Sequence, residues 1–157
     1  MTKLTHVDDE GNARMVDVGD KPITRRVAVA EGTATLGESS LAVLTAGAAA
    51  KGDVLGTAQL AGIQGAKRAS DLVPLCHPIP LDAVAVTLSV DPAASQVHVR
   101  ATVTATWRTG VEMEALAAVS AALLTVYDML KAIDRGIVLG PIRLVEKSGG
   151  RSGAWTR

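Results

Sequence analysis

The sequence has few aromatic residues and almost no cysteine. Phe is absent from its 157 residues, which include one Tyr, two Trp and one Cys. A single cysteine excludes an internal disulfide bond and leaves too few soft ligands for a usual structural zinc site. The hydrophobic core must therefore be aliphatic, and Ala, Val and Leu are the residues available to build it.

The sequence also lacks an excess of either charge and any long apolar run. Its 16 basic and 16 acidic residues cancel, which disfavours a general nucleic-acid-binding protein. The first residues lack the apolar run of a secretory signal peptide, and no stretch approaches the roughly 18 uninterrupted apolar residues of a membrane span. We expect a soluble, cytoplasmic protein with one domain over residues 1–157, whose ends at 1–21 and 147–157 are partly flexible.

Hydrophobic periodicity predicts the secondary structure. The predicted strands cover residues 24–36, 84–90, 97–107 and 137–145, and the predicted helices cover residues 38–45, 53–70 and 111–135. Asp53 is placed to cap the second helix, and Gly136 is placed to end the third. Three prolines within residues 71–81 predict a stiff, extended loop, and residues 15–18 predict a short ordered patch in the N-terminal arm.

This order of elements is the split βαβ pattern of an α+β, ferredoxin-like sandwich, an antiparallel sheet with helices on one face. The uncovered face must meet solvent or a partner. Gly56, Gly62 and Gly65 on the second helix would let another backbone approach closely, or they are only poor helix formers. The sequence leaves both readings open.

Ionisable residues gather at both ends of the long helix. Asp128 and Lys131 are three residues apart, so they are neighbours on its surface and away from its buried stripe. Such a pair is most often a solvated ion pair worth roughly 0.2–0.5 kcal/mol. Glu112 and Glu114 lie in the first turn, where acidic residues complement the helix dipole and where carboxylates could also accept N–H groups of a purine or pterin edge.

Two other segments hold groups that could bind an anion or a small molecule. Cys76 and His77 lie in the stiff loop, which can hold side chains in a fixed pose. Lys51 lies at a helix entry, and the glycine-rich segment 147–153 carries Lys147 and Arg151, so both could meet phosphate. The sequence contains neither a P-loop nor a Gly-x-Gly-x-x-Gly motif. The residues alone point to an oligomeric domain that binds an anionic, phosphorylated small molecule.

These segments together resemble the molybdenum cofactor biosynthesis protein C family, the cyclic pyranopterin monophosphate synthases. The resemblance spans nearly the whole chain and keeps its order. The matching pieces are Thr5-His6, Met15-Val16-Asp17-Val18, Lys51-Gly52-Asp53-Val54, Ala61-Gly62-Ile63-Gln64, Ala66-Lys67-Arg68, Leu75-Cys76-His77-Pro78, Gly110-Val111-Glu112-Met113-Glu114-Ala115-Leu116, Tyr127-Asp128-Met129, Lys131-Ala132, Gly140-Pro141 and Lys147-Ser148-Gly149-Gly150. The segment Ala48-Ala49-Ala50 departs from the family, whose members often carry polar residues such as His there.

The resemblance implies a ferredoxin-like lyase of molybdopterin biosynthesis. Its substrate would be 3′,8-cyclo-7,8-dihydroguanosine 5′-triphosphate, a nucleotide derivative, and its products cyclic pyranopterin monophosphate and diphosphate. It further implies a homohexamer, a trimer of dimers with active sites at dimer interfaces, and neither nucleic acid nor membrane as a partner. No resident cofactor or metal ligand is implied, although Mg²⁺ could accompany the triphosphate.

The resemblance also assigns roles to residues. Asp128, Lys51 and Lys131 would be catalytic, with Lys51 as the proton carrier and Lys131 remaining charged. The substrate-binding residues would be Leu75, Cys76, His77, Met113, Glu114, Glu112, Lys67, Lys147 and Arg26.

Two other functions fit the same fold. A non-catalytic nucleotide sensor would bind without turnover, and the number of ionisable residues in the matched motifs argues against it. An RNA-binding sheet would need aromatic residues for stacking, but Thr102, Thr104 and Thr106 stand where they would be wanted.

Overall fold

The computed structural model describes residues 6–157, so the Thr5 part of the first matched motif lies outside the described residues. The element order is β1 (Thr24–Thr35), α1 (Glu38–Thr45), α2 (Val54–Lys67), α3 (Ala69–Leu72), β2 (Ala83–Asp91), β3 (Gln96–Trp107), α4 (Glu112–Leu130), β4 (Val138–Ser148) and β5 (Trp155–Thr156). The sheet has the strand order β2-β3-β1-β4-β5, and every neighbouring pair is antiparallel. The first four strands have the ferredoxin-like arrangement, which confirms the predicted fold class.

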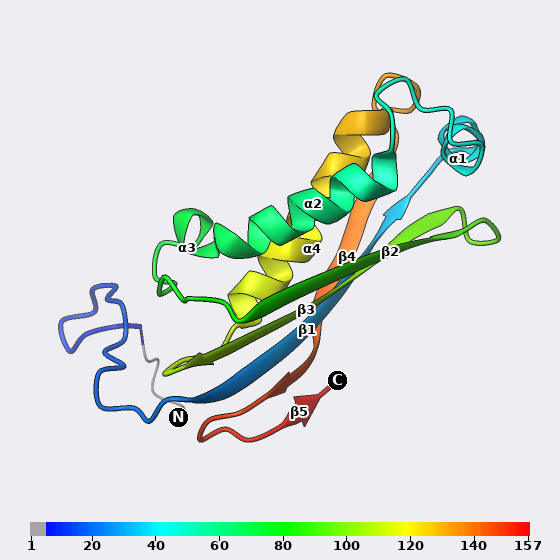
Figure 1. Ribbon diagram of the computed structural model, residues 1–157. Coiled ribbons are helices and arrows are strands. Elements are labelled where there is room, and N and C mark those ends of the chain that lie inside the picture. The colour runs from blue at the N-terminus through cyan, green and yellow to red at the C-terminus, as the bar shows by residue number, and fades with distance from the viewer. Residues whose placement is uncertain (1–5) are drawn as a thin grey trace.

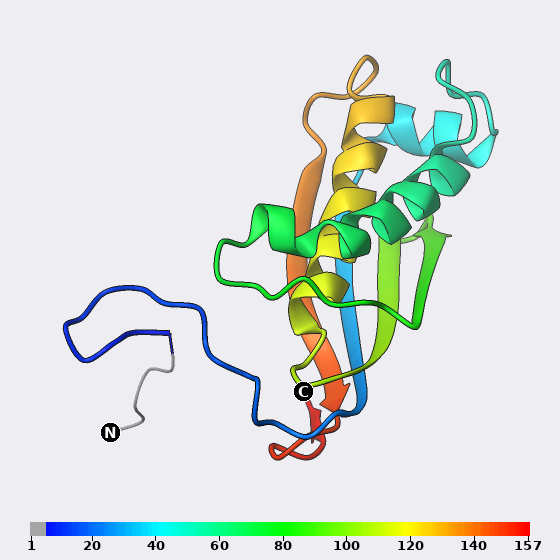
Figure 2. The same ribbon diagram turned by 60° about the vertical axis from the view of Figure 1, so that its left-hand side comes forward.

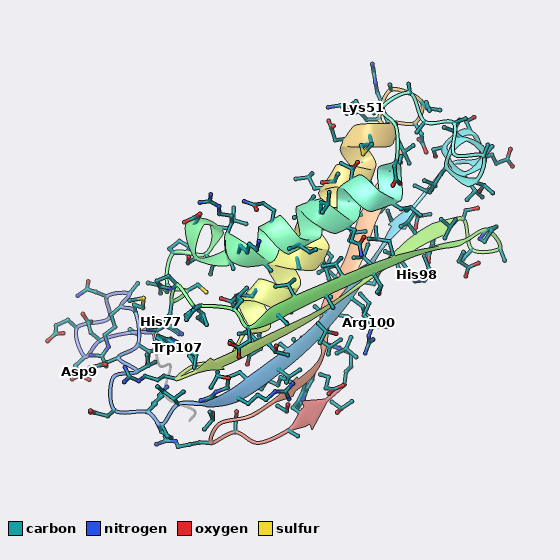
Figure 3. The ribbon with its side chains drawn as sticks, in the orientation of Figure 1. Asp9, Lys51, His77, His98, Arg100 and Trp107 are labelled. Carbon is teal, nitrogen blue, oxygen red and sulfur yellow. The ribbon has the colours of Figure 1, made fainter. Side chains whose placement is uncertain are left out.

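The strands alternate between a buried and an open face. In β3, Val97, Val99, Ala101, Val103 and Ala105 point into the core and are at most 1% exposed. Polar residues occupy the intervening positions, as period-2 patterning requires of a sheet with one covered face. On that open face Glu31 accepts hydrogen bonds from Arg100 and Arg143, and Figure 3 shows Arg100 projecting from the side of the sheet without helices.

Helices α2 and α4 cover one face of the sheet (Figure 1). Val119, Leu123, Val126 and Leu130 of α4 are fully buried. By length and composition α4 alone among the described helices could cross a membrane, but 56% of that window is buried, as expected for the core helix of a soluble fold.

Close packing of α2 on α4 answers the question left open for two of the three glycines. A Cβ on Gly65 would lie 2.6 Å from the Ala121 Cβ, and one on Gly62 would lie 3.1 Å from the Ala118 carbonyl oxygen. The backbones of the two helices therefore approach closely within one chain. Gly56 instead faces its own N-cap residue, Asp53, whose Oδ1 accepts from the Gly56 N–H at 2.9 Å.

The long helix ends earlier than predicted. Its last residue is Leu130, and Lys131, not Gly136, is the residue that caps it. Asp134 then accepts hydrogen bonds from the Gly37 and Gly136 N–H groups, and the segment 131–136 forms turns. Ile133, which lies in this segment, is 43% exposed.

Smaller differences concern the loop and the tail. The helix predicted over 53–70 is broken at Arg68, and α3 extends into the segment expected as a loop. The last strand runs three residues further than predicted, so Lys147 belongs to β4 rather than to the tail, and β5 pairs back on it. The Gly140–Pro141 peptide is cis and lies beside a shift in the β1–β4 register, where a proline without an N–H group can be accommodated.

The N-terminal arm runs outside both layers. Figure 2 shows the segment before β1 extending away from the helices and the sheet. Residues 15–18 have no regular secondary structure, but the Val16 carbonyl lies 2.8 Å from His77 Nε2. This contact joins the segment to the loop that carries His77.

Candidate functional site

Lys51, Asp128 and Lys131 form one cluster, which we call the lysine–aspartate cluster. Lys51 Nζ lies 2.7 Å from Asp128 Oδ2 and also donates to the Asp128 carbonyl oxygen at 2.8 Å. Lys131 Nζ lies 2.7 Å from the other carboxylate oxygen, Oδ1. Each side chain is about half exposed, so the cluster is open to a ligand.

Local structure explains how the cluster forms. Asp128 and Lys131 lie at the C-terminal end of α4, one turn apart. Lys51 comes from the loop between α1 and α2, where Gly47 and Gly52 adopt positive φ angles of 63° and 91°. Asp53 then caps α2 and fixes where this loop ends.

The contact between Asp128 and Lys131 keeps these two members of the cluster charged. Hydrogen bonds from Lys131 and Lys51 lower the pKa of Asp128 to about 2. The same hydrogen bond with Asp128 raises the pKa of Lys131, as the sequence predicted. At neutral pH Asp128 is therefore a carboxylate and Lys131 an ammonium group.

A second feature is a cavity of about 450 Å³ at the other end of α4, which we call the basic cavity. Its charged lining consists of Lys21, Arg26, Arg108, Lys147, Arg151 and Glu112. Five cationic side chains thus face one carboxylate, although the chain as a whole is neutral. Lys147 Nζ lies 2.9 Å from Glu112 Oε1, which leaves the net charge of the lining positive.

Arg26 is held by backbone groups of the basic cavity. Its Nε donates to the Trp107 carbonyl at 3.3 Å and its Nη2 to the Arg108 carbonyl at 3.2 Å. Its guanidinium also lies so close to Gly150 that a side chain there would collide with it. Gly149 and Gly150, both with positive φ, provide the tight turn beside it.

A third group surrounds the start of α4. Cys76 Sγ donates to Glu114 Oε1 at 3.5 Å, and Glu114 is only 3% exposed. Burial and the neighbouring Glu114 carboxylate raise the pKa of Cys76 to about 11, and burial raises the pKa of Glu114 as well. The second carboxylate oxygen, Glu114 Oε2, is buried and has no hydrogen-bond partner among the described residues.

The structure does not bring all candidate residues together in one chain. Figure 3 shows Lys51 at one end of the helical layer and His77 at the other. Glu112 and Asp128 are 16 residues apart on α4, which corresponds to about 24 Å along the helix axis. Lys67 is exposed at the end of α2 and does not line the basic cavity, and Leu75 and Met113 lie beside Cys76 and Glu114 along the chain.

Two of the charged lining residues of the basic cavity were not predicted from the sequence. Lys21 lies in the arm and Arg108 directly follows β3. The pairing of Trp107 with Thr24 at the end of the sheet places Lys21 and Arg108 beside the start of β1. Their position at the cavity depends on this strand register, which the sequence alone does not show. In the described part of the chain, no three His, Cys, Asp or Glu side chains gather into a group that could hold a metal ion.

Comparison with known proteins assigns these features to a family. The model of the MoaC family matches residues 15–150, which include all three groups except Arg151. The chain belongs to the MoaC family. It is 57% identical over 153 residues to a Cereibacter sphaeroides protein, covering 98% of this chain and 96% of that one. It is 54% identical over 157 residues to a Thermomicrobium roseum protein, covering 100% and 95%, and 56% identical over 155 residues to one from Novosphingobium aromaticivorans, covering 99% and 98%. All three MoaC relatives are named cyclic pyranopterin monophosphate synthase.

Proposed function

We propose that this MoaC-family chain converts 3′,8-cyclo-7,8-dihydroguanosine 5′-triphosphate to cyclic pyranopterin monophosphate and diphosphate in molybdenum cofactor biosynthesis. The reaction is a phosphorus–oxygen lyase step, and we propose that it takes place in the cytoplasm. The observation that carries the proposal is the lysine–aspartate cluster, in which Lys51 reaches Asp128 from a segment 77 residues away. The names of relatives at 54–57% identity supply the reaction.

The lysine–aspartate cluster suits the proton transfers of the ring rearrangement. Asp128 stays ionised down to a pH of about 2, so at neutral pH it stabilises positive charge and does not act as a general acid. Lys131 stays protonated and stabilises negative charge. Lys51, on the loop, is left as the group that carries protons to and from the substrate.

The basic cavity suits the triphosphate. A triphosphate carries about four negative charges near neutral pH, and the cavity presents five cationic side chains. A substrate oxygen attacks the α-phosphorus, the bond from that phosphorus to the diphosphate oxygen breaks, and the hydroxyl proton passes to the protein. Lys147 and the other fixed cations stabilise the charge that develops on the departing diphosphate.

The group at the start of α4 suits the ring system. The buried, unpartnered Glu114 Oε2 is an acceptor for a ring N–H group. Leu75, Cys76, His77 and Met113 would form the walls of this pocket, with Glu112 at its border to the basic cavity. Lys67 would reach the substrate from the end of α2.

We propose that two subunits complete each site, because the groups lie at opposite ends of α4. Between the two ends, α4 presents an exposed line of Met113, Ser120 and Leu124, which has helical spacing and leads to Lys131. A second α4 packed antiparallel along this line, with Ser120 near a twofold axis, would bring the Met113 end of one subunit to the Lys131 end of the other. Three such dimers would make the proposed homohexamer.

Mg²⁺ enters this proposal only as a companion of the substrate phosphates. The chain's cations, not a resident metal or cofactor, would neutralise most of the charge. Diphosphate release in the presence of excess EDTA would therefore slow but not stop.

The test is turnover of the enzymatically prepared cyclic GTP derivative, with diphosphate measured by a coupled assay and the pterin product by mass spectrometry. Asp128→Ala and Lys51→Ala should abolish the product. Asp71→Ala is the matched control, since Asp71 forms a comparably exposed ion pair with Arg68. Reversible binding without diphosphate release by the unmodified protein would instead support a nucleotide sensor.

A further inference from the structure

The carboxylate of Asp134 joins two segments that lie far apart in the sequence. Its Oδ2 accepts from the Gly37 N–H at 2.7 Å and from the Ser40 hydroxyl at 2.9 Å, and its Oδ1 accepts from the Gly136 N–H at 2.8 Å. These three donors hold the pKa of the Asp134 carboxyl below its usual value. The charged form therefore bridges the turn after α4 and the start of α1.

Helix α1 depends on this bridge for its N-terminus. Gly37, at its N-cap position, has no side chain to accept a hydrogen bond, and Ser40 is the one residue of α1 that is fully buried. Asp134 thus accepts, from 97 residues away, the N–H of the N-cap residue, a donor that the side chain at N3 bonds in a capping box. Figure 1 shows α1 at one end of the molecule, apart from the α2–α4 pair.

Both segments joined by Asp134 lead directly to the lysine–aspartate cluster. Lys131 is three residues before Asp134, in the same set of turns. The chain leaves α1 at Thr45 and reaches Lys51 six residues later, across a loop that contains Gly47 and Gly52. The position of α1 therefore sets where the Lys51 loop begins.

We propose that Asp134 is a positioning residue. It fixes α1, and with it the start of the Lys51 loop, relative to the end of α4, so that Lys51 contacts Asp128. Asp134 does not touch the substrate. The proposal rests on the function proposed for the cluster, but the geometry that it asserts can be measured without substrate.

The test compares Asp134→Asn with Ser40→Ala and with the control Asp71→Asn. In Asp134→Asn an amide NH₂ group replaces one of the two carboxylate oxygens, so either the Gly37 and Ser40 donors or the Gly136 N–H lose their acceptor. In Ser40→Ala one of the three hydrogen bonds is lost and the other two remain. This milder variant is therefore the one to measure if Asp134→Asn does not fold. Asp71→Asn removes an exposed carboxylate that pairs with Arg68 on the other end of the helical layer.

The first readout is the reactivity of the Lys51 amine, measured as the rate of acetylation by limiting acetic anhydride over a range of pH and resolved by peptide mass spectrometry. Asp134→Asn should change the acetylation rate of Lys51 while leaving that of Lys67 unchanged, and Ser40→Ala should change the Lys51 rate to a lesser degree. Asp71→Asn should leave Lys51 unchanged. Loss of thermal stability with an unaltered Lys51 profile would show a structural role only and would overturn the proposal.

The second readout is turnover. Because a displacement of about 1 Å can lower a rate by about a hundredfold, we expect kcat of Asp134→Asn to fall at least tenfold while KM changes less than threefold. Unchanged kcat in a folded Asp134→Asn variant would overturn the proposal. If the unmodified protein released no diphosphate, the proposed function would fail, while Lys51 acetylation would still decide whether Asp134 positions the loop.

Discussion

At the scale of single residues, the charge on Asp128 is governed by the two ammonium groups that contact it. The hydrogen bond from Lys131 is the larger cause of its lowered pKa, followed by that from Lys51. Lys131→Ala should therefore raise the pKa of Asp128 from about 2 towards its ordinary value of 3.8. The measurement is a carboxyl-carbon NMR titration of both proteins.

The sign of the associated stability change follows from the direction of this shift. A carboxyl whose pKa is lowered by folding stabilises the folded state above its unfolded pKa, and the contribution is lost as the pH falls through the folded value of about 2. In Lys131→Ala the contribution should be smaller and its loss should be complete at a higher pH, because the folded pKa lies closer to the unfolded value. Lys67→Ala is the lysine control, and a shift of Asp128 in that variant would contradict the assignment.

The thiol of Cys76 gives a second residue-scale prediction. With a pKa of about 11, it should remain protonated at neutral pH and react slowly with iodoacetamide. Glu114→Gln should lower the midpoint, because it removes a negative charge, but not to 9.0, because burial is the larger cause. Alkylation rates against pH measure this at the chain's single cysteine, with Glu112→Gln as a control that should leave the midpoint unchanged.

Residue-scale prediction from the sequence reached the Asp128–Lys131 pair but not its full setting. Spacing on a helix makes the two residues neighbours, and the structure confirms their contact. The contact of Lys51 with Asp128 crosses 77 residues, so no local rule predicts it, and only the family resemblance placed the two together. Arg26 was expected to bind substrate, and the structure shows that two of its donors are already taken by backbone carbonyls.

At the scale of elements, the tight α2–α4 contact makes Gly65 a sensitive position. Alanine is a better helix former than glycine by about 1 kcal/mol, but the added Cβ would lie 2.8 Å from the Ala117 carbonyl oxygen as well as against Ala121. We expect Gly65→Ala to lower the free energy of unfolding by about 1–3 kcal/mol, as overpacked cores do. Urea denaturation measures the change.

The neighbouring position supplies the control. Gln64 lies on the exposed side of α2, so Gln64→Ala should change the free energy of unfolding little. A Gly65→Ala protein as stable as the unmodified one would show that α2 and α4 can separate without cost.

Element boundaries could be predicted where local chemistry decides them. β1 and α1 were predicted to within one residue because Gly37 separates a period-2 pattern from a helical one. The end of α4 could not be predicted, because the Asp134 contact with Gly37 that accompanies it comes from tertiary structure. The tail was expected to be flexible from its glycines, whereas pairing of β4 with β1 and β5 gives part of it regular structure.

At the scale of the whole molecule, the separation of His77 from the lysine–aspartate cluster allows a complementation experiment. Asp128→Ala and His77→Ala subunits, co-expressed with different tags, should each be inactive alone. A mixed dimer would contain one site with both residues intact, so random mixing should restore about a quarter of the unmodified activity.

A second pair of variants is the matched control. Lys51 and Asp128 contact each other within one chain, so mixing Lys51→Ala with Asp128→Ala subunits should restore nothing. Mixed oligomers of the first pair that remain inactive, or a stable monomer in sedimentation, would contradict the two-subunit site.

The distribution of the few aromatic residues has an optical consequence. The Trp107 carbonyl accepts a hydrogen bond from Arg26 at the basic cavity, and Trp155 on β5 pairs with Lys147 on β4. The one tyrosine, Tyr127, instead lies beside Asp128 at the opposite end of α4. Fluorescence excited at the red edge of the tryptophan band therefore comes from one end of the helix alone. Filling of the end proposed to bind phosphate should be measurable in real time through the protein's own emission, without an attached dye.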